Sequence, residues 1–172
     1  ETHMNESATP GPVVVLAQSD DDLVAMIEVR AHADTDLPPP RIDNLRRNLV
    51  GNPRLAYLVA RIDDAPVGCG FVDVSYDAAT AHVVVVPAAR RQGLGTALLA
   101  AVSERARASG LTQLQGEIRA IDDESLEFFR RRGFEQVGRE EAVVLDLTGT
   151  DARVVDPPAG IRIVSRAEQP GV

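Results

Sequence analysis

The stretch VVVVPAARRQGLGTALL, residues 83–99, decides the fold. Its consecutive valines are typical of a strand buried on both faces, and Pro87 ends that strand because proline cannot donate to a strand ladder. Over residues 94–102 the apolar side chains recur at helical spacing along one face. The sequence therefore predicts a central strand, a loop and an amphipathic helix over residues 93–109.

The loop before this helix has the composition of an anion site. The first N–H groups of a helix have no intrahelical acceptor, and the helix dipole adds partial positive charge there. Gly93 and Gly95 carry no Cβ, so phosphate oxygens can approach the backbone, and Arg90 and Arg91 add cationic donors. We expect residues 90–96 to bind a pyrophosphate.

Other interpretations of the loop fit less well. A dinucleotide fingerprint requires a small residue where Leu98 stands, and a Walker loop requires Gly-Lys-Ser/Thr, which the sequence lacks. A plain strand-to-helix turn without a ligand stays open as an alternative.

The remaining elements flank this segment on both sides. Ser19 and the three aspartates after it are helix-start signals, and Asp63-Asp64 is a tight turn between two strands. A first helix starts at residue 20 and ends before Pro38. In chain order the sequence also predicts strands over residues 13–16, 55–62, 66–75, 81–86, 111–118, 134–137 and 142–147, and helices over residues 42–49 and 122–132.

Composition excludes several classes of function. The chain has 172 residues and a formal net charge of -8, so we expect no nucleic-acid partner. No apolar run approaches the length of a membrane span, and we expect a cytoplasmic protein. The single cysteine, Cys69, allows no intrachain disulfide and no metal-binding Cys pair, so we predict a buried strand residue there and no metal.

Two motifs together resemble the GNAT family of N-acetyltransferases. The first, Val85-x-Pro87-x-x-Arg90-Arg91-Gln92-Gly93-Leu94-Gly95-Thr96, is similar to the family's coenzyme A-binding motif. The second, Ser125-Leu126-Glu127-Phe128-Phe129-Arg130-Arg131-Arg132-Gly133-Phe134, is similar to a motif that commonly reads A-x-x-F-Y-E-K-x-G-F. The resemblance covers residues 12–147 and implies an α/β fold with a seven-stranded, mostly antiparallel sheet, splayed between strands 4 and 5, and about four helices.

The resemblance also assigns a donor site. The backbone of Val85 and Val86 would bond the pantetheine arm of acetyl-CoA like an added strand. The N–H groups around Gly93 would hold the pyrophosphate, and a backbone N–H in the splay would polarise the thioester carbonyl. The expected cofactor-binding residues are Val85, Val86, Arg90, Arg91, Gln92, Gly93, Leu94, Gly95, Thr96 and Phe129.

The catalytic residues are not identified by this pattern. Phe129 stands where the family often has a Tyr that protonates the leaving thiolate, and Asp122 stands where Asn is frequent. The acid–base candidates are Glu117 on the fifth strand and Asp73 and Tyr76 at the end of the third, each of which also fits a solvated strand residue. His82 is expected to face away from Val83 and Val85, and His32 lies near a helix end.

The two ends of the chain suggest further organisation. Residues 1–11 combine a tag remnant before Met4 with a polar segment, and residues 148–159 resemble a linker. Residues 160–168 weakly repeat the pattern of residues 11–20, so residues 160–172 are either an extra strand or the start of a second, truncated GNAT-like repeat. A homodimer and a second domain in the same chain both stay open.

The sequence leads to two hypotheses about function. The first is transfer of an acetyl group from acetyl-CoA to an amine of a small molecule or peptide, by direct attack in a ternary complex. The second is a non-catalytic acyl-CoA-binding or structural half of a tandem GNAT protein, which the missing hydroxyl at Phe129 favours.

Overall fold

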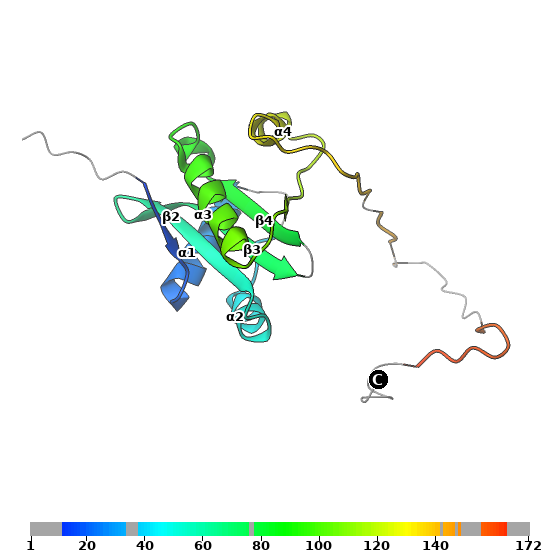
Figure 1. Ribbon diagram of the computed structural model, residues 1–172. Helices are drawn as coiled ribbons and strands as arrows, with labels where there is room; N and C mark the ends of the chain where they lie inside the picture. Colours follow the sequence, from blue (N-terminus) through cyan, green and yellow to red (C-terminus); the bar gives the residue numbers. More distant parts are fainter. Residues whose placement is uncertain are drawn as a thin grey trace, which may run out of the picture. The chain divides into compact units, whose positions relative to one another are not determined.

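A computed structural model describes residues 12–33, 38–75, 78–141, 143–146, 148 and 156–164. The chain forms two compact units, of which the first ends at Phe128 and the second begins at Phe129. The first unit is built on a five-stranded sheet in the order β1-β2-β3-β4-β5 (Figure 1). The elements are β1 (Val13–Leu16), α1 (Asp20–Ala33), α2 (Ile42–Gly51), β2 (Leu55–Ile62), β3 (Ala65–Ser75), β4 (Ala78–Val85), a 3-10 turn (Pro87–Ala89), α3 (Leu94–Ala108), β5 (Leu114–Gln115) and α4 (Asp123–Arg130).

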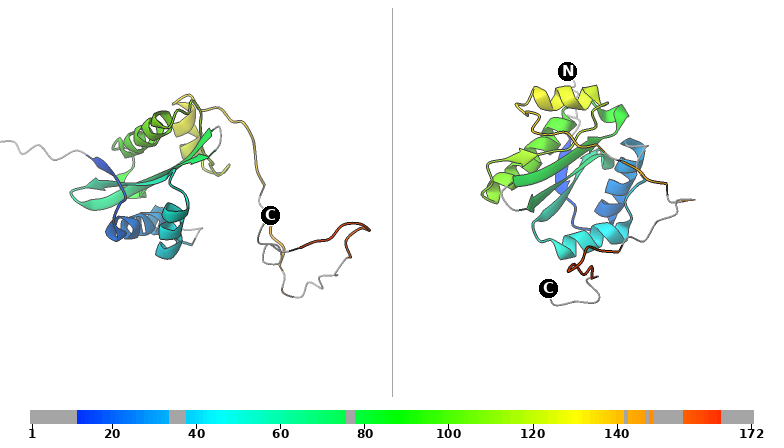
Figure 2. Two further views of the ribbon diagram at one scale, coloured as in Figure 1. Left: turned by 60° about the horizontal axis from the view of Figure 1, so that its bottom comes forward. Right: turned by 90° about the vertical axis from the view of Figure 1, so that its right-hand side faces the viewer.

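The sheet of the first unit has helices on both faces. Helices α1 and α2 cover one face and α3 covers the other (Figure 2). Strands β1 to β4 pair antiparallel, whereas β5 runs parallel to β4. The connection from β4 to α3 therefore crosses from the sheet to the helix on its second face, and this connection carries the predicted anion loop.

The β2–β3 hairpin forms as predicted. Its turn residues Asp63 and Asp64 have φ angles of 47° and 64°. Positive φ at both central positions matches the right-handed twist of the flanking strands, and Asp tolerates this region better than most residues. The hairpin supplies β3, the central strand of the sheet, against which β4 aligns.

Helix α1 begins at a reciprocal cap. The Asp22 N–H donates to Ser19 Oγ at 3.2 Å, and the Ser19 N–H donates to Asp22 Oδ2 at 3.1 Å. Asp22 also pairs with Arg61 of β2 at 3.2 Å. The hydrogen bond from the Ser19 hydroxyl is the main cause that lowers the pKa of Asp22 to about 2, and it outweighs the opposing effect of burial.

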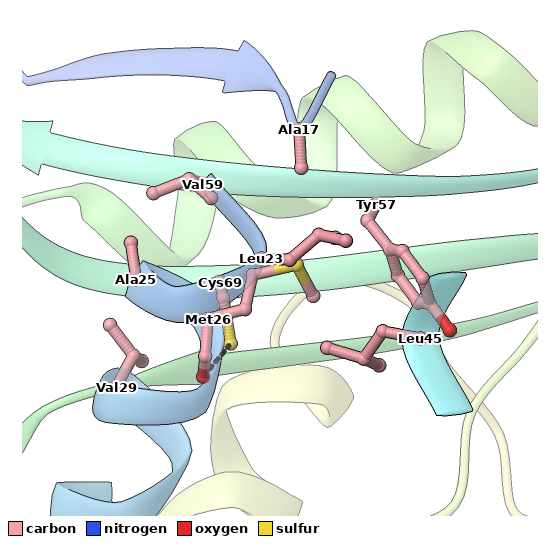
Figure 3. Packing of buried hydrophobic residues seen from close by; sticks show 9 residues of the cluster. All are labelled: Ala17, Leu23, Ala25, Met26, Val29, Leu45, Tyr57, Val59 and Cys69. Carbon is pink, nitrogen blue, oxygen red and sulfur yellow. Dashed lines mark hydrogen bonds between the residues drawn. The ribbon is translucent and has the colours of Figure 1, made fainter. Parts of the chain in front are cut away.

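The core between α1, α2 and the sheet is apolar, and Figure 3 shows nine of its residues. Cys69 is 2% exposed on β3, as predicted, and its thiol lies 4.0 Å from the Met26 carbonyl oxygen. Burial raises the pKa of this thiol to about 12. The cluster comprises Ala17, Leu23, Ala25, Met26, Val29, Leu45, Tyr57, Val59 and Cys69.

The opposite face of the sheet packs against α3. Leu98 is fully buried and lies over two glycines of β3. A Cβ on Gly68 would lie 3.1 Å from Leu98 Cδ1, and a Cβ on Gly70 would lie 2.9 Å from the His82 carbonyl oxygen. The glycines therefore let α3 and β4 approach β3 closely, and burial of the Leu98 side chain stabilises the fold by about 2 kcal/mol.

Several predicted strands are wrong. In the described part of the chain the sheet has five strands, not seven. Strand β5 spans Leu114–Gln115 instead of residues 111–118, and residues 134–137 form no strand. Residues 143–146 form none either, while Ala142 and Leu147 lie outside the described residues. An apolar run forms a strand only where a neighbouring strand pairs with its backbone by hydrogen bonds. The side chains of Val137 and Val144 are 89% and 95% exposed, so these runs do not pack against the sheet. Strand β4 also starts earlier than predicted, at Ala78 instead of residue 81.

Residues 161–164 form no strand, and residues 165–172 of the predicted second repeat lie outside the described part of the chain. None of the helices in the described ranges combines the length and apolar character that crossing a bilayer demands. Among the same residues, His, Cys, Asp and Glu side chains form no group of three that could hold a metal ion.

Candidate functional site

The β4–α3 connection contains two residues with positive φ. Arg91 has φ 64° and Gly93 has φ 83°, which is the left-handed region. A Cβ on Gly93 would contact nothing within 4 Å, so the need for glycine there comes from the backbone conformation and not from crowding. These two conformations let the chain turn between the end of β4 and the start of α3.

Helix α3 begins immediately after Gly93. The Ala97 N–H donates to the Gly93 carbonyl at 3.0 Å, so the N–H groups of Leu94 and Gly95 precede the first intrahelical bond of the cap. Such groups, with the helix dipole behind them, attract an anion. Leu94 itself is 1% exposed and anchors the helix start in the core, whereas the Thr96 side chain is exposed.

Gly95 has a packing partner that the sequence did not reveal. A Cβ at this position would lie 3.2 Å from Cε2 of Phe128, an aromatic residue of α4. The absence of a side chain at Gly95 thus lets an aromatic ring approach the first turn of α3. The prediction that Gly95 makes room for phosphate oxygens stays a prediction, and packing is a second physical reason for glycine here.

The two arginines of the loop contact one carboxylate. Arg90 Nη1 lies 3.2 Å from Glu124 Oε2, and Arg91 Nη2 lies 3.0 Å from Glu124 Oε1. Arg90 Nε also donates to the Val85 carbonyl oxygen at 3.3 Å. The Gln92 side chain donates to the Ala88 carbonyl at 3.4 Å. The loop is therefore held by its own side chains and by the start of α4.

One edge of β4 is largely unpaired. Within residues 78–141, β4 pairs with β5 at only two positions, Ala79 with Leu114 and Thr80 with Gln115. Towards the loop, β4 continues to Val85 with β3 on its other side. This is the splay between strands 4 and 5 that the sequence predicted, and it leaves backbone groups of β4 facing an open edge.

The direction of each backbone N–H follows from two hydrogen bonds. The Val86 N–H donates to Val67 O of the β3 side at 3.0 Å, and the Ala79 N–H donates to Gln113 O of the β5 side at 3.1 Å. Because N–H groups alternate along a strand, those of Val83 and Val85 point to the open edge. The Val86 N–H, by contrast, already takes part in the sheet.

A cleft of about 480 Å³ lies beside the end of β4. This volume is typical of sites for small molecules. His32, which the sequence placed at a helix end, contacts this cleft, and its Nδ1 lies 2.7 Å from the Glu28 carbonyl oxygen. The cleft is lined by Glu28, Val29, His32, Pro66, Val86, Pro87 and Ala88.

Of the acid–base candidates, Asp73 lies near the start of β4, away from the anion loop. Asp73 is opposite Thr80 in the β3–β4 register, level with the last β4–β5 pair, and its Oδ1 accepts a hydrogen bond from Asn52 Nδ2 at 2.9 Å. Glu117 is exposed two residues beyond β5, not on the strand as predicted. Tyr76 lies outside the described residues. His82 stacks on Phe71 with ring centroids 5.7 Å apart.

Asp122 caps helix α4. Its Oδ1 accepts the Ser125 N–H at 3.0 Å, and its Oδ2 accepts the Ser125 hydroxyl at 2.7 Å. Although partial burial acts to raise the pKa of Asp122, these hydrogen bonds and the nearby Arg90 and Arg119 outweigh it and lower the pKa. Asp122 therefore has a structural role at the position where the related motif has Asn.

In the second unit, Phe129 packs against Phe134. Their ring centroids are 4.9 Å apart and the rings are nearly perpendicular. The Phe134 N–H donates to the Phe129 carbonyl at 3.2 Å. The aromatic pair of the second motif thus stabilises the end of α4 and the turn that follows it, and the Phe129 side chain carries no hydroxyl that could donate a proton.

Sequence reasoning missed Glu124, Phe128 and the cleft. Glu124 and Phe128 lie at least 33 residues after the loop residues that they contact, so no local spacing connects them to the loop. The acidic residues in the first turn of α4 also complement the dipole of that helix. The one signal in the sequence was the opposite charge of Glu124 and the Arg90-Arg91 dipeptide. Only the fold shows that these side chains meet.

Known proteins resemble this chain in sequence and in fold. The profile of the acetyltransferase (GNAT) domain matches residues 53–136. An IAA acetyltransferase from Azospirillum brasilense is 30% identical over 122 residues, which are 69% of this chain and 80% of the relative. Among solved structures, an acetyltransferase from Trypanosoma brucei is 19% identical with a TM-score of 0.65, and the match covers 78% of this chain and 99% of that one. AAC(6')-Iy, solved with the bisubstrate analogue CoA-S-monomethyl-acetylneamine, is 16% identical with a TM-score of 0.67, covering 80% and 99%.

Proposed function

The chain belongs to the GNAT family of acetyltransferases, and from this premise we propose that it transfers an acetyl group from acetyl-CoA to an amine of a small molecule or peptide. The observation that carries the proposal is the open edge of β4, which leads directly into the N-terminus of α3. An edge of N–H and C=O groups suits an amide-bearing arm, and a helix N-terminus suits phosphates. Acetyl-CoA presents both features in one molecule.

The donor would lie along β4 with its pyrophosphate at the start of α3 and its acetyl end towards Thr80. Its pyrophosphate would contact the N–H groups of Leu94 and Gly95, and its pantetheine amides would bond the edge groups of Val85 and Val83. The arm would then run towards Thr80, where β4 and β5 begin to pair. The similar fold of AAC(6')-Iy was solved with a ligand that contains CoA, which supports CoA as the donor.

The reaction is a direct transfer. The amine nitrogen attacks the thioester carbonyl carbon, a C–N bond forms, the C–S bond breaks, and the CoA thiolate leaves and takes up a proton. A backbone N–H of the β4 edge would stabilise the developing oxyanion. Asp73, level with the end of the β4–β5 pairing, is the described candidate for accepting the amine proton, and Glu117 is the second.

Binding is tested by calorimetry with CoA. We expect the double substitution Gly93→Asp, Gly95→Asp to abolish most of the affinity, because it places two carboxylates where the pyrophosphate would lie. Gly51→Asp, an exposed glycine with nothing within 4 Å of its Cβ position, is the control and should bind like the unmodified chain. Unchanged affinity of the double variant would show that the pyrophosphate lies elsewhere.

Catalysis is tested separately by thiol release from acetyl-CoA across a panel of amines. Turnover by this chain alone supports the transferase function and excludes the non-catalytic alternative. Tight CoA binding without turnover on any amine supports the alternative, an acyl-CoA-binding half of a tandem protein. The Phe129 side chain, which lacks the hydroxyl of the related motif, is the observation that keeps this second function under test.

A further inference from the structure

One carboxylate occupies both arginines of the anion loop. Glu124 lies in the first turn of α4, and each of its oxygens contacts a different guanidinium, Oε2 with Arg90 at 3.2 Å and Oε1 with Arg91 at 3.0 Å. A carboxylate that bridges two guanidinium groups uses the same donors that a phosphate would use. The structure therefore pairs the cationic groups that are expected to bind the donor with a carboxylate of the protein itself.

These ion pairs are weak enough to exchange. The side chains of Arg90, Arg91 and Glu124 are 41%, 78% and 45% exposed, and ion pairs this exposed to water contribute little free energy. A pyrophosphate carries more charge than a carboxylate and can also accept from the N–H groups at the start of α3, which Glu124 does not contact in the described structure. The pyrophosphate should therefore displace Glu124.

We propose that Glu124 is a built-in competitor for the donor's phosphates, which occupies Arg90 and Arg91 in the free protein and recaptures them when CoA leaves. This inference rests on the proposed function, because it assumes that the loop binds the CoA pyrophosphate. Arg90 meets the acidic start of α4 at Glu124, and its charge also contributes to lowering the pKa of Asp122, which caps the same helix. Glu124 thus lowers the affinity for CoA and favours release of the product.

The test compares Glu124→Gln with a matched control. Gln keeps the length of the side chain and removes its charge, whereas Glu104→Gln removes the same charge from an exposed position in the second half of α3. The dissociation constants of CoA and of acetyl-pantetheine, which lacks phosphates, are measured by calorimetry. Glu124→Ala is measured in parallel, and thermal unfolding of each variant verifies that it is folded.

We expect Glu124→Gln and Glu124→Ala to bind CoA about three to ten times more tightly, on the scale of one or two exposed ion pairs. Acetyl-pantetheine binding should change less than about twofold, because this ligand places no phosphate at the loop, and Glu104→Gln should change neither ligand by more than this. A general structural effect would alter both ligands alike.

The outcomes distinguish the competitor role of Glu124 from the proposed donor site. If the unmodified chain binds CoA and both Glu124 variants bind it equally or more weakly, the competitor role is overturned and the proposed function stands. If the Glu124 variants bind CoA and the unmodified chain does not, Glu124 competes strongly enough to prevent binding, which supports the competitor role. If no variant binds CoA, both the inference and the proposed donor site are overturned.

Discussion

Val85 and Val86 are neighbours on β4 whose N–H groups point in opposite directions. The Val86 N–H donates to Val67 O at 3.0 Å, while that of Val85 points to the edge that β5 leaves unpaired. Proline has no N–H. Val85→Pro therefore removes a group that only a ligand would use, and Val86→Pro removes a group that the sheet uses.

The expected magnitudes follow from these contacts. A hydrogen bond contributes about 0.5 to 1.5 kcal/mol net, and the ring of proline at position 85 would also occupy the space of the ligand's carbonyl oxygen. We therefore expect Val85→Pro to weaken CoA binding by roughly tenfold or more. Val86 already has φ -58°, which suits proline, so Val86→Pro should cost the lost hydrogen bond and crowding against Val67 O, together about 1 to 3 kcal/mol of unfolding free energy.

Each variant is measured for CoA affinity by calorimetry and for stability by urea unfolding. With a slope of about 2 kcal/mol per molar urea, Val86→Pro should lower the urea midpoint by roughly 0.5 to 1.5 M and leave CoA affinity within about threefold. Val85→Pro should show the smaller loss of stability and the larger loss of affinity. The opposite order, in which Val86→Pro loses CoA and Val85→Pro retains it, would refute the proposal that the pantetheine arm lies on this edge.

Three further predictions concern the fold. Gly70→Ala places a Cβ 2.9 Å from a backbone oxygen of β4 and should lower the unfolding free energy by about 2 to 3 kcal/mol, whereas Gly51→Ala, with open space around it, should be neutral or stabilising in the same urea experiment. Asp22→Asn should lower the free energy of unfolding by about 1 to 2 kcal/mol at pH 7. Because the pKa of Asp22 is lower in the folded state than in the unfolded state, this difference should vanish as pH falls from about 4 to about 2. Asp21→Asn, at an exposed position, should show neither effect. The Cys69 thiol should resist alkylating reagents in the folded protein and react fully in denaturant, as mass spectrometry would show; rapid labelling of the folded chain would contradict its burial.

The elements around the anion loop could be predicted from sequence because their signals are local. Consecutive valines, a proline stop and a helical apolar period determine β4 and α3, and the predicted helix 93–109 agrees with Leu94–Ala108 within one residue at each end. The hairpin turn at Asp63 and the cap at Ser19 are equally local. Each of these features depends on residues a few positions apart, where backbone and side-chain preferences act directly.

The C-terminal strands could not be predicted in the same way. Leu111–Ile118 has the composition of a strand, yet only Leu114–Gln115 pairs with β4. The chain diverges from β4 after Gly116, whose Cβ position lies 3.3 Å from the Ala81 carbonyl oxygen. How far two parallel strands stay paired depends on their relative twist and on the residues between them, and a pattern within one strand carries no information on this.

The donor site combines two kinds of recognition that respond differently to substitution. The open edge of β4 would bind the donor through backbone groups, so side-chain changes at Val83 or Val85 should alter it little and only proline removes a donor. At the anion loop, charged side chains would act beside the backbone N–H groups of α3, and there Glu124 opposes Arg90 and Arg91 with one charge against two. It follows that the edge determines which type of molecule fits, an extended amide-bearing arm, while the balance of charges at the loop determines how tightly that molecule is held. Substitution at Glu124 should therefore change affinity for CoA without changing which acyl donors the chain accepts.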